Sequence, residues 1–328
     1  MFVLGIESSC DETAASVVKD GKYVLSSIVS SSLKEHKKYG GVVPEIASRM
    51  HLESISRVAG SAVKEAGIKM KDLGLVSVTA GPGLAGSLLV GISFAKSLSL
   101  GLGVPLLGVD HLAGHIYANF LGPSPLRAPF VALIVSGGHT TLFYVRDLDR
   151  IDILGKTSDD ACGEAFDKVA KILGLGYPGG PVIERAARSG DAGKFSFRCS
   201  NTHNPLDFSF SGIKTAVLYA VKKHPHKGKR FIRDISASFQ EAAVDTLVNK
   251  SLYACRLKKA RRLVIGGGVA ANSRLREKMR VECEKRGVEL FFPSLSFCLD
   301  NAAMVAGLGY SLFKKGHRSG LELNIAGN

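Results

Sequence analysis

The sequence lacks cysteine pairs of the C-x-x-C type, although six cysteines are scattered along its 328 residues. A zinc ribbon requires such pairs and a disulfide framework requires regular cysteine spacing, so neither class of protein is indicated. The N-terminal segment also lacks the basic start and unbroken apolar stretch of a secretory signal, because Glu7 and Asp11 interrupt it. We therefore expect a cytoplasmic protein in a reducing compartment.

Two common signatures of nucleotide-binding proteins are absent as well. The sequence contains no G-x-x-x-x-G-K-[ST] motif, and the three glycines at 266–268 do not belong to a G-x-G-x-x-G motif. A nucleotide site must therefore be sought in glycine-rich turns that match neither motif, among them 266–268, where three glycines between a strand and a helix let a ribose or base come near the backbone.

One apolar run, residues 88–109, is long enough to raise the question of a membrane span. Lys96 near its middle, three serines and Pro105 argue against that interpretation, because charges and broken hydrogen bonds are costly in lipid. We expect a helix, a loop and a strand in this run, and no membrane contact.

Acidic residues are too few to balance the basic ones. Forty-three Lys and Arg residues against 29 Asp and Glu residues give a net charge of +14, which favours attraction to a polyanion such as RNA, DNA or an acidic membrane surface. The basic segments 222–230, 256–262 and 274–280 lack interleaved aromatic residues and match no RNA-binding module. They are either solvated surface or phosphate-binding segments, and in the second case binding should weaken steeply with salt.

Two patterns occur twice along the chain. Residues 2–18 and 129–145 each consist of an apolar strand, a turn of small residues and a second strand. Residues 75–98 and 262–279 each consist of a strand, a glycine-rich turn and a helix. A chain of 328 residues is long enough for two lobes, so the repetition predicts a duplicated α/β unit. Its glycine-rich turns, with helix N-termini beside them, are suited to bind phosphate.

His111 and His115 form the first candidate site. Residues four apart on a helix lie on one face, so both imidazoles can reach one metal ion, and the pair directly follows a predicted strand. The alternative is two buried histidines that bond to the backbone. A zinc peptidase would carry H-E-x-x-H, but Leu112 replaces the glutamate, which argues against hydrolysis. Asp300 is a candidate third ligand, or else the N-cap of the last helix.

Several other residues have two readings. The turn in 135–141 is either an ordinary hairpin or a phosphate cradle. Asp167 either pairs with Lys171 on its helix or contacts a ribose. The acidic turn with Glu7, Asp11 and Glu12 consists either of surface carboxylates or of groups that handle a metal or a proton.

Nine segments resemble one known family. They are GIESSCDET, GGVVPEIASRMH, TAGPGLAGSLLVG, VDHLAGH, LIVSGGHT, GEAFDKVAKILGLGYPGGP, FSFSGIKT, GGGVAANSRLR and LDNAAMVA, in order from residue 3 to about residue 310. Together they closely resemble the bacterial TsaD family, formerly called O-sialoglycoprotein endopeptidase or Gcp. The resemblance implies the two-lobed actin-like, sugar-kinase and Hsp70-like (ASKHA) fold. We expect one lobe from residues 1–126 and 296–328, carrying the metal-binding helix, and the other from 127–295, carrying most of the adenylate-binding loops.

The resemblance also implies an activity. Members transfer a threonylcarbamoyl group from threonylcarbamoyl-AMP to N6 of the adenosine 3′ of the anticodon, in tRNAs that read codons beginning with A. The amine attacks, AMP leaves, and no covalent intermediate is expected. The implied partners are tRNA, a TsaB-like inactive paralogue, a TsaE-like ATPase and a TsaC-type synthase that supplies the adenylate.

The same resemblance assigns site residues. His111, His115 and Asp300 match the family's metal ligands, with Fe2+ expected and Zn2+ as the alternative. Asp11 and Glu12 match its acidic turn and are the catalytic candidates, with Asp11 considered as the proton acceptor. The residues expected to bind an adenine nucleotide (threonylcarbamoyl-AMP, ATP or AMP) are Ile134, Val135, Ser136, Gly137, Gly138, Asp167, Gly180, Glu184 and Asn272.

Two rival functions remain open at this point. A small-molecule kinase of the same fold class would consume ATP and phosphorylate a sugar or an acid. A non-catalytic, nucleotide-bound scaffold would keep its partner binding after His111 and His115 are replaced by alanine.

Overall fold

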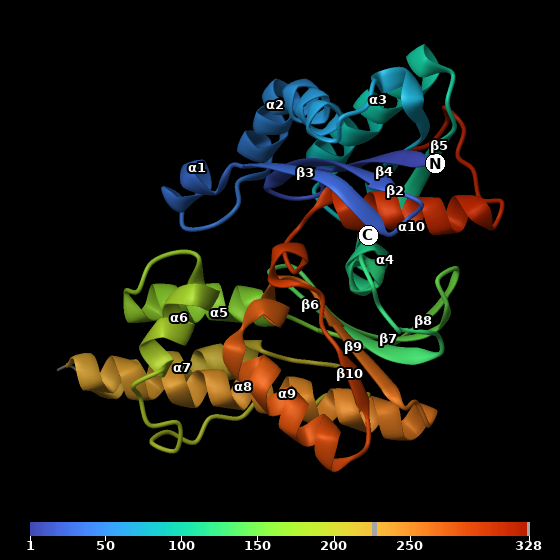
Figure 1. The fold of residues 1–328 in the computed structure, drawn as a ribbon. Helices are drawn as coiled ribbons and strands as arrows, with labels where there is room; N and C mark the ends of the chain where they lie inside the picture. Colours follow the sequence, from blue (N-terminus) through green and yellow to red (C-terminus); the bar gives the residue numbers. More distant parts are fainter. Residues whose placement is uncertain (225–227, 327–328) are drawn as a thin grey trace. The chain divides into compact units, whose positions relative to one another are not determined.

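A computed structural model of the chain describes residues 1–224 and 228–326. The chain divides into two compact units, one formed by Met1–Leu126 with Pro293–Asn328 and the other by Arg127–Phe292. Figure 1 shows the elements of both units. Each unit is described by itself below.

The first unit contains a five-stranded sheet with the order β3-β2-β1-β4-β5. Its strands are β1 (Phe2–Glu7), β2 (Glu12–Lys19), β3 (Tyr23–Ser31), β4 (Leu73–Gly81) and β5 (Leu106–Asp110). The first three pair antiparallel, whereas β4 and β5 join as parallel strands. Its helices are α1 (Leu33–Lys37), α2 (Pro44–Glu65), α3 (Ala85–Leu102), α4 (His111–Tyr117) and α10 (Ala302–Lys314), with short 3-10 turns at Met70–Asp72, Ala118–Phe120 and Leu295–Phe297.

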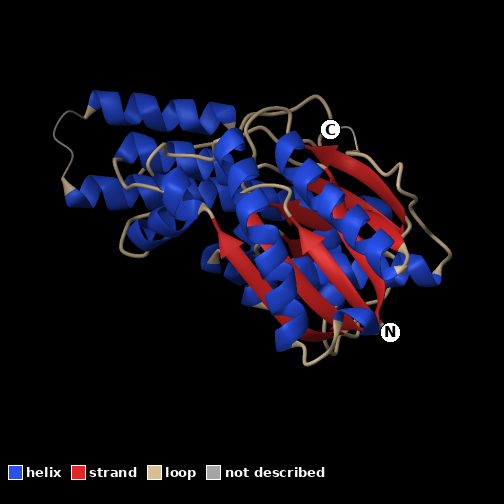
Figure 2. Ribbon diagram, turned by 90° about the horizontal axis from the view of Figure 1, so that it is seen from above, coloured by secondary structure: helices blue, strands red, loops and turns tan. Residues whose placement is uncertain are grey.

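The second unit repeats this arrangement with the strand order β10-β9-β6-β7-β8. Its strands are β6 (Phe130–Val135), β7 (Thr140–Asp147), β8 (Arg150–Lys156), β9 (Arg262–Gly266) and β10 (Glu289–Phe291). Its helices are α5 (Cys162–Leu173), α6 (Gly179–Ala187), α7 (Ser211–Lys223), α8 (Lys229–Lys258) and α9 (Ser273–Lys285), with a 3-10 turn at Gly268–Ala271. Here too the first three strands, β6, β7 and β8, pair antiparallel, whereas β9 and β10 join as parallel strands. The predicted duplication is confirmed, and Figure 2 shows the strands with helices packed around them.

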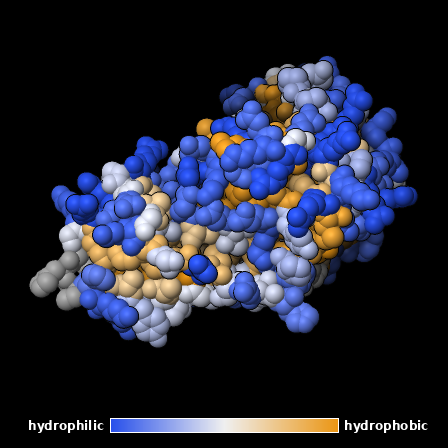
Figure 3. Space-filling view, turned by 90° about the horizontal axis from the view of Figure 1, so that it is seen from below, coloured by the Kyte–Doolittle hydropathy of each residue, from blue (hydrophilic) through white to orange (hydrophobic). Residues whose placement is uncertain are grey.

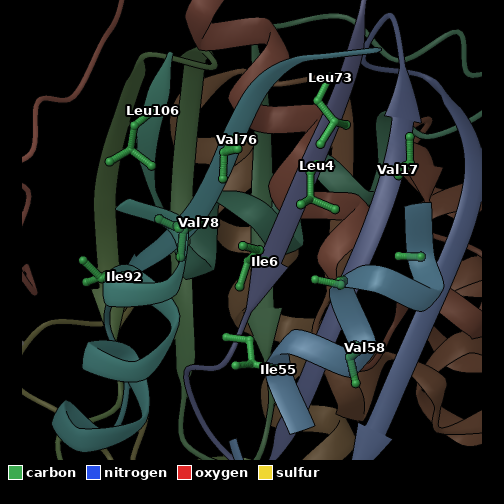
Figure 4. Close-up of a cluster of buried hydrophobic side chains, with 14 of the residues drawn as sticks. Leu4, Ile6, Val17, Ile55, Val58, Leu73, Val76, Val78, Ile92 and Leu106 are labelled. Atoms are coloured by element: carbon green, nitrogen blue, oxygen red, sulfur yellow. The ribbon is translucent and has the colours of Figure 1, made fainter. Parts of the chain in front are cut away.

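The central strand of the first sheet, β1, is buried on both of its faces. Side chains alternate along a strand, and Leu4 and Ile6 enter a core with residues of α2 and α3, such as Ile55 and Ile92 (Figure 4). Gly5 faces the other way, where α10 packs so closely that an added Cβ would lie 2.1 Å from the carbonyl oxygen of Ala302. Glu7 continues the Gly5 face and is also buried.

The apolar run 88–109 forms the predicted helix, loop and strand, as α3 and β5. By length and composition alone α3 could cross a membrane, a test that core helices also pass. Its buried residues, including Leu88 and Ile92, pack into the core of the first unit.

The polar segment 222–230, which contains proline and glycine, predicts an exposed loop, but this is wrong at both ends, where α7 extends to Lys223 and α8 begins at Lys229. Helical hydrogen bonding outcompetes the loop there because neither end carries a proline. Residues 225–227, in the middle of that segment, lie outside the described residues.

Candidate metal centre and nucleotide site

The histidine pair lies at the start of α4, immediately after β5. Asp110 ends the strand and caps the helix, its carboxylate accepting a hydrogen bond from the amide of Ala113 at 2.8 Å. The helix therefore begins at His111, and His115 follows one turn later on the same face. Their ring centroids are 4.7 Å apart and the rings are nearly perpendicular. The capping aspartate thus fixes where both imidazoles project.

Asp300 completes this cluster from the opposite end of the sequence. The N-cap of α10 is Asn301, whose side chain accepts from the amide of Met304 at 3.0 Å, so the interpretation of Asp300 as that cap is wrong. The Asp300 carboxylate instead lies 3.1 Å from Nε2 of His115 and 3.7 Å from Nε2 of His111. One ligand atom from each of the three residues lies within 4.8 Å of the others.

The donor set of this cluster suits a divalent transition metal. Two imidazole nitrogens and one carboxylate oxygen leave coordination positions open, as catalytic sites do. Both histidines are buried, whereas the Asp300 carboxylate is 20% exposed, so a ligand can approach from its side. Burial alone lowers the pKa of His111, but the charges of Glu7 and Asp300 raise it to about 9. The cluster therefore stabilises positive charge, which is what a cation site requires.

Glu7 is not a surface carboxylate. It is fully buried, and its Oε2 lies 3.0 Å from Nδ1 of His111. Burial raises the pKa of Glu7, but the charge and hydrogen bond of His111 outweigh burial, so the pKa is lowered overall. The carboxylate is thus joined directly to the histidine pair.

Asp11 and Glu12 form a second acidic group. Burial, followed by the charge of Asp300, raises the pKa of Asp11. Burial raises the pKa of Glu12 to about 7 against one opposing hydrogen bond from Ser31. Among the described residues, Oε2 of Glu12 is a buried atom without a hydrogen-bond partner. Glu12 can therefore exchange a proton near neutral pH.

His51 of α2 holds this acidic turn in place. Its Nε2 lies 2.9 Å from the carbonyl oxygen of Cys10, and its Nδ1 lies 2.7 Å from the hydroxyl of Thr13. The hydroxyl of Ser54 also donates to that of Thr13, at 3.0 Å. The segment GGVVPEIASRMH thus contributes a buried histidine that fixes the turn between β1 and β2.

The predicted phosphate cradle is the turn between β6 and β7. Ile134 and Val135 are fully buried in β6, so their side chains are not available to a ligand. Gly137 and Gly138 are exposed, and nothing lies within 4 Å of a Cβ added to either. The amide of Gly163, in the first turn of α5, donates to the carbonyl of Ser136 at 3.1 Å. Open glycine amides and a helix N-terminus therefore meet at this turn.

Asp167 lies one helical turn beyond Gly163 and ties α5 to α6. Its Oδ1 accepts from the amide of Gly179 at 2.6 Å, a contact that neither reading of the sequence foresaw. The adjacent Gly180 has open space where a side chain would be. The carboxylate thus fixes the first turn of α6, which presents Gly180.

Glu184 and Asn272 complete a closed series of contacts, here called the ring, that runs through the β6–β7 turn, α5, α6 and the segment between β9 and α9. Oε1 of Glu184 accepts from the hydroxyl of Ser273 at 2.5 Å. Asn272 caps α9 by accepting from Leu275, and its Nδ2 donates to Gln240 at 2.9 Å. Gly267 lies shortly before Asn272, and a Cβ added to it would lie 2.4 Å from the carbonyl oxygen of Val135. The ring therefore leads back to the β6–β7 turn, and every nucleotide-site candidate lies on it within the second unit.

Sequence reasoning did not identify three of the positions that hold these sites together. They are Glu7 as a partner of His111, and Gly163 and Gly267 as the close contacts of the β6–β7 turn. Signals existed for two of them, because Glu7 lies on the strand face of Gly5 and Gly163 lies in the first turn of a predicted helix. Gly267 was read only as part of a triple glycine.

The basic segments differ in how far their charge is balanced. In 274–280, Arg274 pairs with Glu241 and Glu277, and Lys278 also pairs with Glu241, so much of this segment is neutralised. In 256–262 the described contacts include one ion pair, Arg262 with Glu289. Hydrophilic residues predominate on the face shown in Figure 3, with hydrophobic residues in separate groups between them.

Comparison with known proteins identifies relatives over nearly the whole chain. A protein from Clostridium botulinum is 49% identical over 328 residues, covering 99% of this chain and 96% of its own. One from Symbiobacterium thermophilum is 52% identical, covering 98% and 95%. One from Thermosipho africanus is 52% identical, covering 100% and 99%. All three are tRNA N6-adenosine threonylcarbamoyltransferases by name.

Solved structures at low identity share the fold. The activator of 2-hydroxyisocaproyl-CoA dehydratase from Clostridium difficile matches with a TM-score of 0.56 at 16% identity, covering 96% of this chain and 97% of that one. HypF from T. kodakarensis matches with a TM-score of 0.62 at 16% identity, covering 98% and 48%. ROK hexokinase from Thermus thermophilus matches with a TM-score of 0.50 at 17% identity, covering 97% and 100%. The ASKHA-type fold expected from the sequence is confirmed.

The family assignment rests on the sequence itself. The sequence model of the TsaD family, described as tRNA N6-adenosine threonylcarbamoyltransferase, matches residues 23–307. With relatives of that name at about half identity over their full length, the chain belongs to the TsaD family of tRNA-modifying transferases.

Proposed function

We propose that this chain transfers threonylcarbamoyl from threonylcarbamoyl-AMP to N6 of the adenosine 3′ of the anticodon, in tRNAs that read codons beginning with A. The family assignment supports the reaction class. The observation that carries the proposal is that ligand atoms of His111, His115 and Asp300 lie within 4.8 Å of one another, although Asp300 is far from the two histidines in the sequence. The chemistry requires one place for a metal and another for an adenylate. The first unit offers the former and the second unit the latter.

His111, His115 and Asp300 would hold the metal. A set of two histidines and one carboxylate with open positions is typical of Fe2+ sites, so Fe2+ is proposed and Zn2+ is the alternative. When bound, such an ion supplies a Lewis acid that polarises a carbonyl oxygen.

The ring in the second unit would bind the adenylate. Exposed amides of Gly137 and Gly138, with the N-terminus of α5 beside them, are suited to a phosphate group. Gly180 would leave room for the nucleoside, and Glu184 and Asn272 would hold the far side of the ring. Ile134, Val135 and Ser136 would contribute backbone, and Asp167 would keep α6 in position.

The proton released from N6 requires an acceptor. Glu12, whose pKa is raised to about 7 by burial, is the candidate that matches a neutral working pH, with Asp11 beside it. As N6 attacks the carbamoyl carbon, the bond to the phosphate oxygen breaks, AMP leaves with that electron pair, and the carboxylate takes the amine proton. No nucleophilic serine or cysteine is needed.

The setting follows from the same assignment. We propose a cytoplasmic enzyme that works with a TsaB-like paralogue and a TsaE-like ATPase and receives its adenylate from a TsaC-type synthase. The part formed by residues 1–126 and 296–328 would act as the metal-carrying lobe and residues 127–295 as the adenylate lobe.

The test is transfer of labelled threonine from threonylcarbamoyl-AMP onto unmodified tRNA, with the partner proteins present. We expect transfer that a chelator abolishes, that added Fe2+ or Zn2+ restores, and that His111→Ala and His115→Ala remove. Retained transfer in both variants would take the metal out of the proposal. ATP consumption by this chain with a sugar or acid, and no transfer to tRNA, would favour the kinase.

A further inference from the structure

Glu7 is a buried carboxylate that the proposed reaction does not use. It ends β1 with no exposed surface. Its Oε1 accepts from the amide of Ser9 at 2.6 Å, and its Oε2 accepts from the hydroxyl of Thr79 at 2.6 Å. Within the described chain, its ion-pair partner is His111, and no lysine or arginine nitrogen lies within 4.0 Å of it. A buried charge without a cationic partner is costly, so this carboxylate needs positive charge close by.

The contact with His111 determines which ring nitrogen carries a proton. Nδ1 lies 3.0 Å from Oε2 of Glu7 and 3.1 Å from Oγ of Ser9. If Nδ1 were a bare acceptor, its lone pair would face a carboxylate oxygen at hydrogen-bond distance, which is repulsive. Nδ1 therefore carries the hydrogen and donates it to Glu7. When Nε2 loses its proton to bind a metal, the ring's lone pair is therefore on Nε2, the atom that faces Asp300.

The charges around the two imidazoles support the same arrangement. With both rings neutral, Glu7 on one side and Asp300 on the other leave two negative charges in a largely buried cluster. A divalent cation held by His111, His115 and Asp300 would balance these two negative charges. The imidazole of His111, bound to the cation through Nε2 and to Glu7 through Nδ1, would couple the cation to the Glu7 carboxylate.

We propose that Glu7 is a positioning residue of the metal centre, holding His111 in the Nδ1–H form with Nε2 directed at the ion. This inference rests on the proposed metal site and adds a residue to it that does not itself touch the ion. Ser9, in the turn after β1, and Thr79, in β4, also donate to Glu7, but the ring of His111 is oriented by its own contact with the carboxylate. The alternative is that Glu7 only ties β1 to β4 within the core.

Glu7→Gln separates these two roles. Glutamine keeps the size of the side chain and an oxygen for Thr79 or Ser9, but its amide would donate to Nδ1 and move the ring proton to Nε2, where the metal belongs. We expect the affinity for Zn2+, measured by competition with a chelator, to fall by ~10–100-fold. Thr79→Val is the matched control, because it removes one hydrogen bond from the same carboxylate and leaves its charge and its contact with His111. Its Zn2+ affinity should stay within about threefold of wild type.

The outcomes of this titration are distinct. Equal Zn2+ affinity in Glu7→Gln and wild type, or equal losses in Glu7→Gln and Thr79→Val, would overturn the proposal and leave the metal site intact. If the His111→Ala variant binds Zn2+ as tightly as the wild type does, both the metal site and this inference are overturned. Should Glu7→Gln fail to fold, Glu7→Asp is measured instead. Its shortened carboxylate should weaken Zn2+ binding several-fold, and wild-type affinity would contradict the proposal.

Discussion

Glu12 is a carboxylate whose surroundings raise its pKa to about 7, so that it ionises near neutral pH. Burial raises its pKa to about 7 from an ordinary 4.5, Ser31 opposes this, and the charges of Asp11 and Asp300 add to it. A carboxyl whose pKa is raised by folding binds its proton more tightly in the folded state. Its contribution to stability is therefore present below pH 4.5 and is lost as the pH rises through 7.

The Glu12→Gln variant tests this. We expect its melting temperature relative to wild type to be higher at pH 8 than at pH 5, because the buried charge is removed only where wild type is ionised. We also expect the transfer activity of wild type to rise between pH 6 and 8 as Glu12 ionises, and the activity of Glu12→Gln to show no such rise. Glu35→Gln is the control, since the pKa of Glu35 is lowered by its hydrogen bond to Lys38 and no gain at pH 8 is expected. A pH-independent difference for Glu12→Gln would contradict this account.

Asp300 and Asp110 are two aspartates near the histidine pair with different roles. Asp300→Asn removes a proposed ligand, so Zn2+ affinity should fall by more than the ~10–100-fold typical of an outer-shell partner. Asp110→Asn keeps the cap of α4, because asparagine caps helices as well as aspartate does, and should leave affinity nearly unchanged. Chelator competition on both proteins gives the comparison, and equal losses would mean that Asp300 acts only through charge.

At the scale of elements, the packing of α10 on β1 is what brings Asp300 to the histidines. Gly5→Ala would place a methyl group 2.1 Å from the carbonyl oxygen of Ala302, forcing α10 away. We expect a loss of ~1–3 kcal/mol in the free energy of unfolding, together with weaker Zn2+ binding. Gly60→Ala, in the interior of α2 with nothing near its Cβ, should instead gain ~0.5–1 kcal/mol. Urea unfolding measures the change in the free energy of unfolding for both variants. If Gly5→Ala leaves Zn2+ affinity unaffected, the packing of α10 on β1 does not position Asp300 in the metal site.

The contact between α5 and the β6–β7 turn has the corresponding role in the second unit. A Cβ at Gly163 would lie 2.5 Å from the carbonyl oxygen of Ser136 and 2.8 Å from Cα of Gly137. Gly163→Ala should therefore displace the turn and weaken AMP binding by more than about tenfold, while Zn2+ affinity is retained. Gly212→Ala in α7 of the same unit meets only the movable hydroxyl of Ser200, so it should leave AMP binding unchanged. Calorimetric titration with AMP distinguishes them.

The elements themselves could be predicted because their signals are local. An apolar run that ends in small residues predicts a strand and a turn, and three glycines before a helical pattern predict a strand–helix junction; β1, β6 and β9 follow these rules. Contacts such as that of Glu7 with His111, 104 positions away, are not local. They arise because α10 covers the second face of β1 and α4 packs against α10, which no periodicity within β1 reveals.

The same distinction explains the site residues. The pairing of His111 with His115 is a helical spacing and was accessible from sequence. Whether Asp300 or Asn301 caps α10 depends on a shift of one residue, and either side chain can cap a helix. The nucleotide candidates Asp167 and Asn272 were named through family resemblance, but their hydrogen bonds to Gly179 and Gln240 depend on the packing of separate helices.

For the whole molecule, the dominant property is the net charge of +14. A tRNA substrate carries many phosphates, and each contact that releases a counterion makes binding more dependent on salt. The basic segments 222–230, 256–262 and 274–280 carry positive charge without interleaved aromatic residues, so most of the attraction to tRNA should be electrostatic.

We therefore expect tRNA affinity to fall by at least about tenfold between 50 and 200 mM salt, with a linear dependence of log affinity on log salt. Adenosine is the control ligand because it carries no phosphate, and its affinity should change little over the same range. Fluorescence anisotropy with labelled tRNA gives the slope, and calorimetry gives the adenosine values. A slope near zero for tRNA would mean that contacts to bases and to the shape of the anticodon arm carry the affinity, and that the excess of basic residues serves the solubility of the chain. A steep slope for tRNA with a flat response for adenosine would instead assign that excess to the phosphate backbone.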